Sequence, residues 1–224
     1  MNGTVVKLIG AAGLVATVAA GCSQSMADPK AAGGAVATAP ASAGTKAAWL
    51  RASLNTMLQE HVYLAAAATN AALNGREAEF KAAASALDDN GVGIAKAIGS
   101  VYGADAEKAF LPLWRRHIGF AVDYTVGVAT GDRGKQDRAV NDLVGYSQDF
   151  GAFLSSANPN LPKSVVADLV KHHVVTLKDV IDAQASKDQA RAYAALRAAA
   201  GHMRMIADPL ADAIVKQFPE KFRG

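Results

Sequence analysis

A pattern that recurs every 56 residues is the feature that most restricts how this chain can fold. Three segments share an apolar residue, a histidine four positions later and a β-branched residue directly after it: Met57–His61–Val62, Leu113–His117–Ile118 and Leu169–His173–Val174. A constant period of this length is typical of proteins built from one repeated supersecondary unit. The sequence therefore predicts three copies of a single unit.

Each unit is predicted to be a helical hairpin. From Trp49 onward, apolar residues recur at spacings of three and four, alanine is abundant and β-branched residues are few, which favours helices over strands. Turn and cap residues interrupt this pattern near positions 74–75, 103–105, 131–134, 158–160 and 186–188. The predicted fold class is all-α, with six long helices arranged as three hairpins that form either a bundle or a short α-solenoid.

The N-terminal segment, residues 1–21, has the pattern of an export signal. It has a basic start, an apolar run too short to span a bilayer, and small residues before Cys22, the only cysteine of the chain. The string Val18-Ala19-Ala20-Gly21-Cys22 resembles the lipobox of bacterial lipoproteins, with Ala19 where that pattern prefers leucine. This resemblance implies that Cys22 becomes the mature N-terminus and carries acyl chains such as palmitate. The alternative is an ordinary cleaved signal peptide that contains a cysteine.

Two further segments follow the signal. Residues 22–46 are rich in Ala, Gly, Ser and Pro, and such a composition predicts a flexible tether between membrane and domain. Residues 47–224 have the length of one well-buried domain, which has no cysteine of its own and so no thiolate metal site. We expect an exported protein that is lipid-anchored to the bacterial cell membrane or outer membrane, with its domain facing the periplasm or the cell exterior.

Composition and motifs argue against nucleic-acid binding and give no indication of catalysis. The 23 Lys and Arg against 20 Asp and Glu leave a net charge of +3, and the positive charges are dispersed. The Glu-x-x-His pairs of di-iron bundles, the Gly-x-Ser-x-Gly elbow and phosphate-binding glycine motifs do not occur. The sequence favours a binding or scaffolding protein over an enzyme. We expect an envelope protein or a small ligand as its partner, and no required cofactor.

The repeat also predicts which polar side chains lie level with one another. Residues equidistant from a turn lie at the same height on antiparallel helices, which pairs His61 with Asn90, His117 with Tyr146 and His173 with His202. In one interpretation these pairs hydrogen bond within each hairpin and fix helix register, with no ligand at all.

The other interpretation is a transition-metal site, because imidazole is a common nitrogen ligand for copper and zinc. His173 and His202 are the first candidates, and Met205, three residues after His202, would add a thioether donor suited to copper. His61 and His117 are further candidates. A methionine in an apolar helix is more often a core gap-filler than a ligand.

Two strings resemble sequences in a little-studied group of exported bacterial helical proteins: Leu113-Trp114-Arg115-Arg116-His117-Ile118-Gly119-Phe120-Ala121-Val122-Asp123-Tyr124 and Ala213-Ile214-Val215-Lys216-Gln217-Phe218-Pro219-Glu220-Lys221-Phe222. The similarity extends from about Leu50 to Phe222 and implies no catalytic residue. Within the first string, Trp114, Phe120 and Tyr124 have a helical spacing that predicts core packing.

Overall fold

The structure, a computed structural model, describes residues 44–223. This part of the chain consists of six α-helices and one short 3-10 helix, with no strand: α1 (Lys46–Leu73), α2 (Glu77–Tyr102), α3 (Ala104–Thr130), α4 (Arg133–Ala157), α5 (Lys163–Ala185), α6 (Gln189–Gln217) and η2 (Pro219–Phe222). The all-α class and the six long helices are confirmed. Cys22, the predicted signal and most of the predicted tether lie outside the described residues.

Local chemistry explains where the helices begin and end. The hydroxyl of Thr45 accepts a hydrogen bond from the N–H of Ala48 at the start of α1, and the carboxylates of Asp132 and Asp188 cap α4 and α6 in the same way. Gly131, with φ of 69°, ends α3 in the left-handed conformation that glycine adopts without strain. Each predicted break falls at a helix junction.

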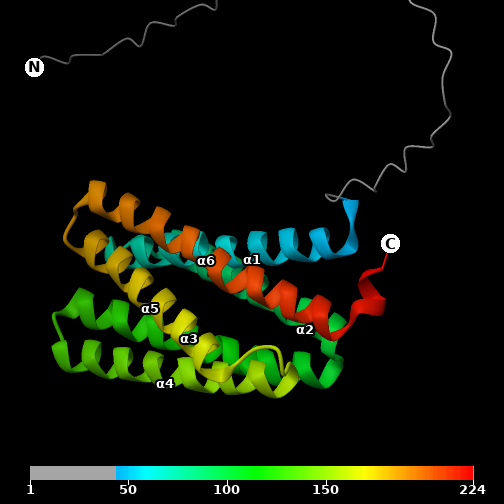
Figure 1. The fold of residues 1–224 in the computed structure, drawn as a ribbon. Helices are drawn as coiled ribbons and strands as arrows, with labels where there is room; N and C mark the ends of the chain where they lie inside the picture. The colour runs from blue at the N-terminus through cyan, green and yellow to red at the C-terminus, as the bar shows by residue number, and fades with distance from the viewer. Residues whose placement is uncertain (1–43, 224) are drawn as a thin grey trace, which may run out of the picture. The chain divides into compact units, whose positions relative to one another are not determined.

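The helices form a closed bundle (Figure 1). Consecutive helices pack as antiparallel neighbours, and α1 also packs against α6, so the last helix returns to the first. This contact decides between the two predicted arrangements in favour of the bundle. The odd-numbered helices α1, α3 and α5 also contact one another, so the middle of the bundle is where their side chains meet.

Aromatic side chains concentrate in one part of a core otherwise made mainly of Ala, Leu, Ile and Val. Trp114 is buried and stacks against Phe110 with ring centroids 5.3 Å apart. Glycine at position 91 lets α2 approach this indole, because a Cβ atom there would lie 2.9 Å from a ring carbon of Trp114. Tyr124 is also buried, as predicted, whereas Phe120 is only partly buried.

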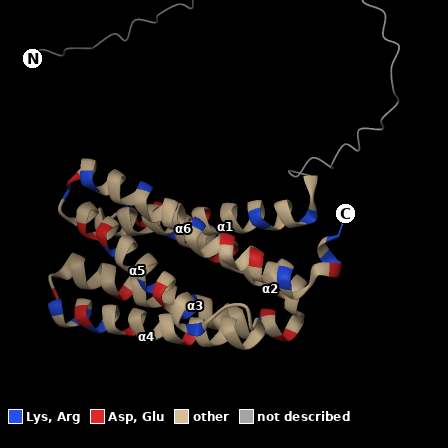
Figure 2. Ribbon diagram, in the orientation of Figure 1, with Lys and Arg blue, Asp and Glu red and all other residues tan. Residues whose placement is uncertain are grey.

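Charged residues of both signs are interspersed along the helices (Figure 2). Ion pairs join neighbouring helices, as between Arg115 and Asp88 (2.7 Å) and between Arg116 and Asp149. These pairs are about half exposed, so each contributes little to stability. Among residues 44–223, none of the helices combines the length and apolarity needed to cross a membrane.

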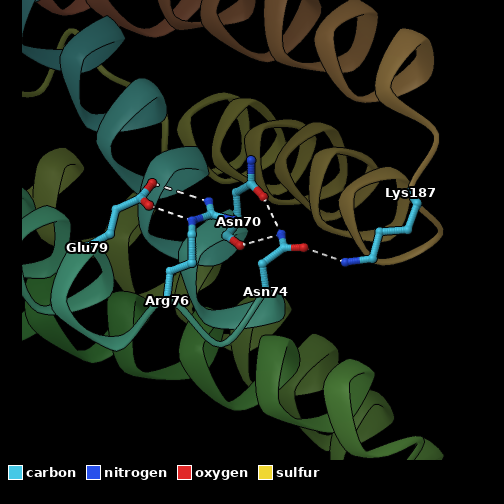
Figure 3. Close-up of polar contacts among 5 residues, drawn as sticks. All are labelled: Asn70, Asn74, Arg76, Glu79 and Lys187. Carbon is cyan, nitrogen blue, oxygen red and sulfur yellow. Dashed lines mark hydrogen bonds and ion pairs between the residues drawn. The ribbon is translucent and has the colours of Figure 1, made fainter. Parts of the chain in front are cut away.

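A cluster of polar side chains connects the turn between α1 and α2 with the turn between α5 and α6 (Figure 3). Lys187, with φ of 61°, donates from Nζ to the Oδ1 atom of Asn74 at 2.5 Å. Asn74 in turn donates to the side-chain oxygen of Asn70, and Arg76 pairs with Glu79 beside them. The cluster is exposed, and it marks where the end of α1 lies beside the α5–α6 hairpin.

Candidate functional site

Three histidine rings meet in the middle of the bundle, one from each odd-numbered helix. The ring centroid of His61 on α1 lies 5.3 Å from that of His117 on α3 and 5.6 Å from that of His173 on α5. The three residues are 1%, 5% and 6% exposed. They are the histidines of the 56-residue pattern, so the pattern identified residues that come together in space. We call these three residues the histidine cluster.

Aromatic rings border the histidine cluster. The indole of Trp114 contacts two of its members, with ring centroids 4.9 Å from His61 and 4.7 Å from His117. Tyr146 stacks on His117 at a centroid distance of 4.8 Å. Trp114 was predicted to be core, and its contact with two candidate ligands could not be read from its spacing alone.

Several nitrogen atoms of the cluster are buried without a hydrogen-bond partner. Both ring nitrogens of His61 are in this state, as is Nδ1 of His173. Hydrogen-bond geometry also leaves Nδ1 of His117 unpartnered, although the pKa of this residue reflects a weak hydrogen-bond interaction with the backbone of Trp114. The indole nitrogen of Trp114 is unpartnered too. A buried polar group without a partner costs about 1–3 kcal/mol, and most buried polar groups in native proteins have one. Several such atoms in one place make the histidine cluster a candidate binding site.

Burial keeps these imidazoles neutral. Loss of hydration lowers the pKa of His61 well below its usual value, and the neighbouring His117 and His173 lower it further. Burial lowers the pKa of His117 to about 3, with a smaller contribution from His173 and an opposing one from the backbone of Trp114. Burial likewise lowers the pKa of His173 to about 4, helped by His202 and His172. Neutral imidazole is the form that binds metal ions.

The ring of His202 contacts His172, although His202 is near enough to His173 to lower the pKa of that residue. His202 donates from Nε2 to a backbone carbonyl of α5 at 2.9 Å, and its ring lies 4.3 Å from the exposed His172. Met205 is 58% exposed. The buried face of α6 passes through Met203, and two residues further along a helix the side chain points to the opposite side.

His61 with Asn90, and His117 with Tyr146, were predicted to hydrogen bond within their hairpins, and the structure shows other contacts for both pairs. Asn90 is buried, but its amide donates to the carbonyl oxygen of Met57 (3.0 Å) and to the carboxylate of Glu60 (2.8 Å). Tyr146 contacts His117 by ring stacking. Among residues 44–223, both ring nitrogens of His61 therefore lack a hydrogen-bond partner. A hydrogen bond between His61 and Asn90 that served only to fix helix register would use one of these nitrogens.

Among the residues that the structure describes, no group of three or more His, Cys, Asp or Glu side chains is placed so that it could hold a metal ion. Two imidazoles on one tetrahedral zinc, each with a Zn–N bond of about 2.0 Å, have ring centres roughly 5 Å apart. The centroid distances from His61 to His117 and to His173 are close to this separation, and a shared ion would require the rings to turn.

A hydrogen-bonded bridge aligns the helices that carry His61 and His173. Gln184 on α5 donates to the carbonyl oxygen of Ala66 (2.9 Å) and accepts from the hydroxyl of Thr69 (2.8 Å), both on α1. All these atoms are buried, and the bonds are therefore expected to fix the register of α1 against α5.

An apolar cavity of about 270 Å³ lies beside the cluster, between α1, α2 and α3. His61 and His117 form part of its wall. Small side chains on the facing helices leave this space: Ala65, Ala68, Ala72 and Ala121. Sequence reasoning missed the cavity, and the available signal was the run of alanines at helical spacing on α1. A smaller cavity of about 40 Å³ adjoins His117 and His173.

The sequence matches no protein-family model, and comparisons with curated proteins and with solved structures give no significant match.

Proposed function

We propose that this chain is a lipid-anchored, non-catalytic binding protein of the bacterial envelope whose ligand is a transition-metal ion, copper or zinc. His61, His117 and His173 would hold the ion. The observation that carries the proposal is the meeting of three buried, neutral imidazoles, in which both nitrogens of His61 and the Nδ1 atoms of His117 and His173 lack hydrogen-bond partners. Imidazole nitrogen is a good ligand for both metals.

The proposal includes the internal repeat. Three copies of one hairpin, with a period of 56 residues, would place the same side chain at the same depth on α1, α3 and α5. An ion at the middle of such a bundle would receive one nitrogen from each copy. Three protein ligands also leave a fourth tetrahedral position open, and the 270 Å³ cavity lies beside two of the ligands.

Charge favours copper in its monovalent state. The ring contacts of the cluster are with Trp114 and Tyr146, so the proposed ligand set is neutral and the charge of a bound ion stays uncompensated. Burying an uncompensated charge is costly, and the cost rises steeply with the size of that charge. We therefore expect Cu(I) to bind before Zn(II).

The first test is thermal unfolding of the chelator-treated chain with and without Cu(I) or Zn(II). A ligand that binds only the folded state must raise the midpoint. We expect a rise that is lost in His173→Leu and retained in His172→Leu, since His172 is the exposed neighbour on the same helix. An equal rise in both variants would place the metal elsewhere, and no rise with either metal would leave scaffolding as the better proposal.

The lipid anchor needs a separate test because residues 1–43 lie outside the described part. Cells that express the chain are labelled with a palmitate analogue, and incorporation is compared between the native sequence and Cys22→Ser. We expect the label to appear on the native chain alone. Equal labelling of both chains would remove the anchor from the proposal.

A further inference from the structure

We propose a second metal site, on the surface of the bundle between α5 and α6, in which His172 and His202 bind a divalent copper ion. The two residues lie outside the histidine cluster, and neither belongs to the 56-residue pattern. The site takes copper in a different oxidation state from the Cu(I) proposed for the cluster, and it does not depend on binding there.

The separation of the two rings fits neighbouring ligands of a square-planar ion. Their centroids lie 4.3 Å apart and their planes are inclined at 57°. With metal–nitrogen bonds of about 2.0 Å, two imidazoles at a right angle around an ion have ring centres about 4.4 Å apart, against roughly 5 Å in a tetrahedral site. Square-planar sites with nitrogen ligands are typical of Cu(II), whereas zinc sites are tetrahedral. The spacing therefore favours Cu(II) over Zn(II).

A hydrogen bond holds His202 in the form that binds a metal ion. Nε2 of this ring lies 2.9 Å from the carbonyl oxygen of Leu169 on α5. A carbonyl oxygen only accepts, so Nε2 carries the proton and Nδ1 of the neutral ring has a free lone pair. Metal-binding histidines almost always donate their other ring nitrogen to a carbonyl, a carboxylate or water, which fixes the tautomer and the ring orientation. The bond to Leu169 therefore prepares Nδ1 of His202 as a ligand.

His172 supplies the second nitrogen from the solvent side. It is exposed, and within residues 44–223 it makes no hydrogen bond. Exposed side chains change rotamer rapidly, so this ring can direct a nitrogen to the ion. Water can also reach the ion at this position and hydrate its charge, which avoids the cost of burying a divalent cation.

The pair provides two protein ligands and no more. Among the residues that the structure describes, no third His, Cys, Asp or Glu side chain joins them in a metal-binding group, so water takes the other positions around the ion. Packing of the two rings without an ion is the competing explanation for their contact. Only a bound ion requires one nitrogen from each ring.

The test is a titration of the chelator-treated full chain with Cu(II), followed by electron paramagnetic resonance, which detects coordinated nitrogen. All chains carry Cys22→Ser, because a free thiol is itself a copper ligand. His172→Leu is the principal variant, since the side chain is exposed and makes no hydrogen bond within residues 44–223. His202→Leu removes the other ligand. His173→Leu is the matched control, which removes a ligand of the histidine cluster and leaves the surface pair intact.

We expect the native chain and His173→Leu to bind one Cu(II) ion with a tetragonal spectrum that shows two coordinated nitrogens. The affinity should fall at least about tenfold in His172→Leu and in His202→Leu. The proposal is overturned if the native chain gives no nitrogen-coordinated Cu(II), or if His172→Leu binds the ion as tightly as the native chain. Loss of the signal in His173→Leu alone would place Cu(II) at the histidine cluster and would also overturn it. Each of these outcomes leaves the proposed binding of Cu(I) by the cluster standing, so the two proposals fail separately.

Discussion

The ring centroids of His61 and His173 lie 5.6 Å apart, although the two residues belong to the first and fifth helices of the bundle. The proximity follows from closure of the bundle, because α1 packs against α6 and thereby also reaches α5. His117 completes the group from α3. Unpartnered polar groups seldom gather in a protein core, and this concentration is the basis for treating the histidine cluster as a binding site.

Replacing His61 with leucine should leave the metal-free protein as stable as before or more stable. Leucine is similar in size, and it removes two buried nitrogens that lack partners, each costing about 1–3 kcal/mol. We expect the free energy of unfolding, measured in urea, to stay level or to rise by up to about 3 kcal/mol. His202→Leu is the contrasting variant, because it loses a hydrogen bond to a backbone carbonyl and should lose stability. A large loss in His61→Leu would show that His61 serves the fold.

The stability of the metal-free protein should fall with pH below about 6.5. In the folded state the pKa of His117 is about 3 and that of His173 about 4, whereas an unfolded histidine has a pKa of about 6.5. Between these values the unfolded chain binds more protons, so stability is full above about pH 6.5 and decreases as the pH falls. Each histidine adds a slope of up to about 1.4 kcal/mol per pH unit.

Urea unfolding between pH 7.5 and pH 5 measures this slope. The double variant His117→Leu/His173→Leu should have a flatter profile, and its remaining slope should come from His61 and His202, whose pKa values burial also lowers. A native profile that does not change over this range would contradict the burial of the cluster.

Close packing of α4 on α5 should make Gly151 intolerant of a side chain. A Cβ atom at this position would lie 2.6 Å from the carbonyl oxygen of Lys163. We expect Gly151→Ala to lower the free energy of unfolding by about 1–3 kcal/mol and to weaken metal binding, since α5 carries His173. Gly145→Ala, on the same helix with nothing within 4 Å of the new Cβ, should instead stabilise by up to about 1 kcal/mol. Similar effects of the two substitutions would argue against this helix contact.

The helices and the residues of the cluster were predictable because they depend on local chemistry and on spacing. Apolar periodicity, glycines such as Gly131 and capping aspartates determine helix ends within a few residues. The 56-residue interval singled out His61, His117 and His173 before their positions in space were known.

The neighbours of each histidine were not predictable, because they depend on how the hairpins close on one another. Equal distance from a turn pairs residues within one hairpin, and it led to His173 with His202. The structure instead directs His173 toward His61 of another hairpin and leaves His202 beside His172. The cavity escaped prediction for the same reason, since an alanine such as Ala68 creates space only when the opposing helix also presents small side chains.

The most direct test of the histidine cluster as a metal site is equilibrium dialysis of the chelator-treated chain against Cu(I), followed by measurement of metal and protein. The native chain, His172→Leu and the single variants His61→Leu, His117→Leu and His173→Leu are compared. We expect one ion per chain in the native protein and in His172→Leu, and a large loss of binding in each of the three cluster variants. Full retention of the ion in all three cluster variants would contradict a metal site at the middle of the bundle.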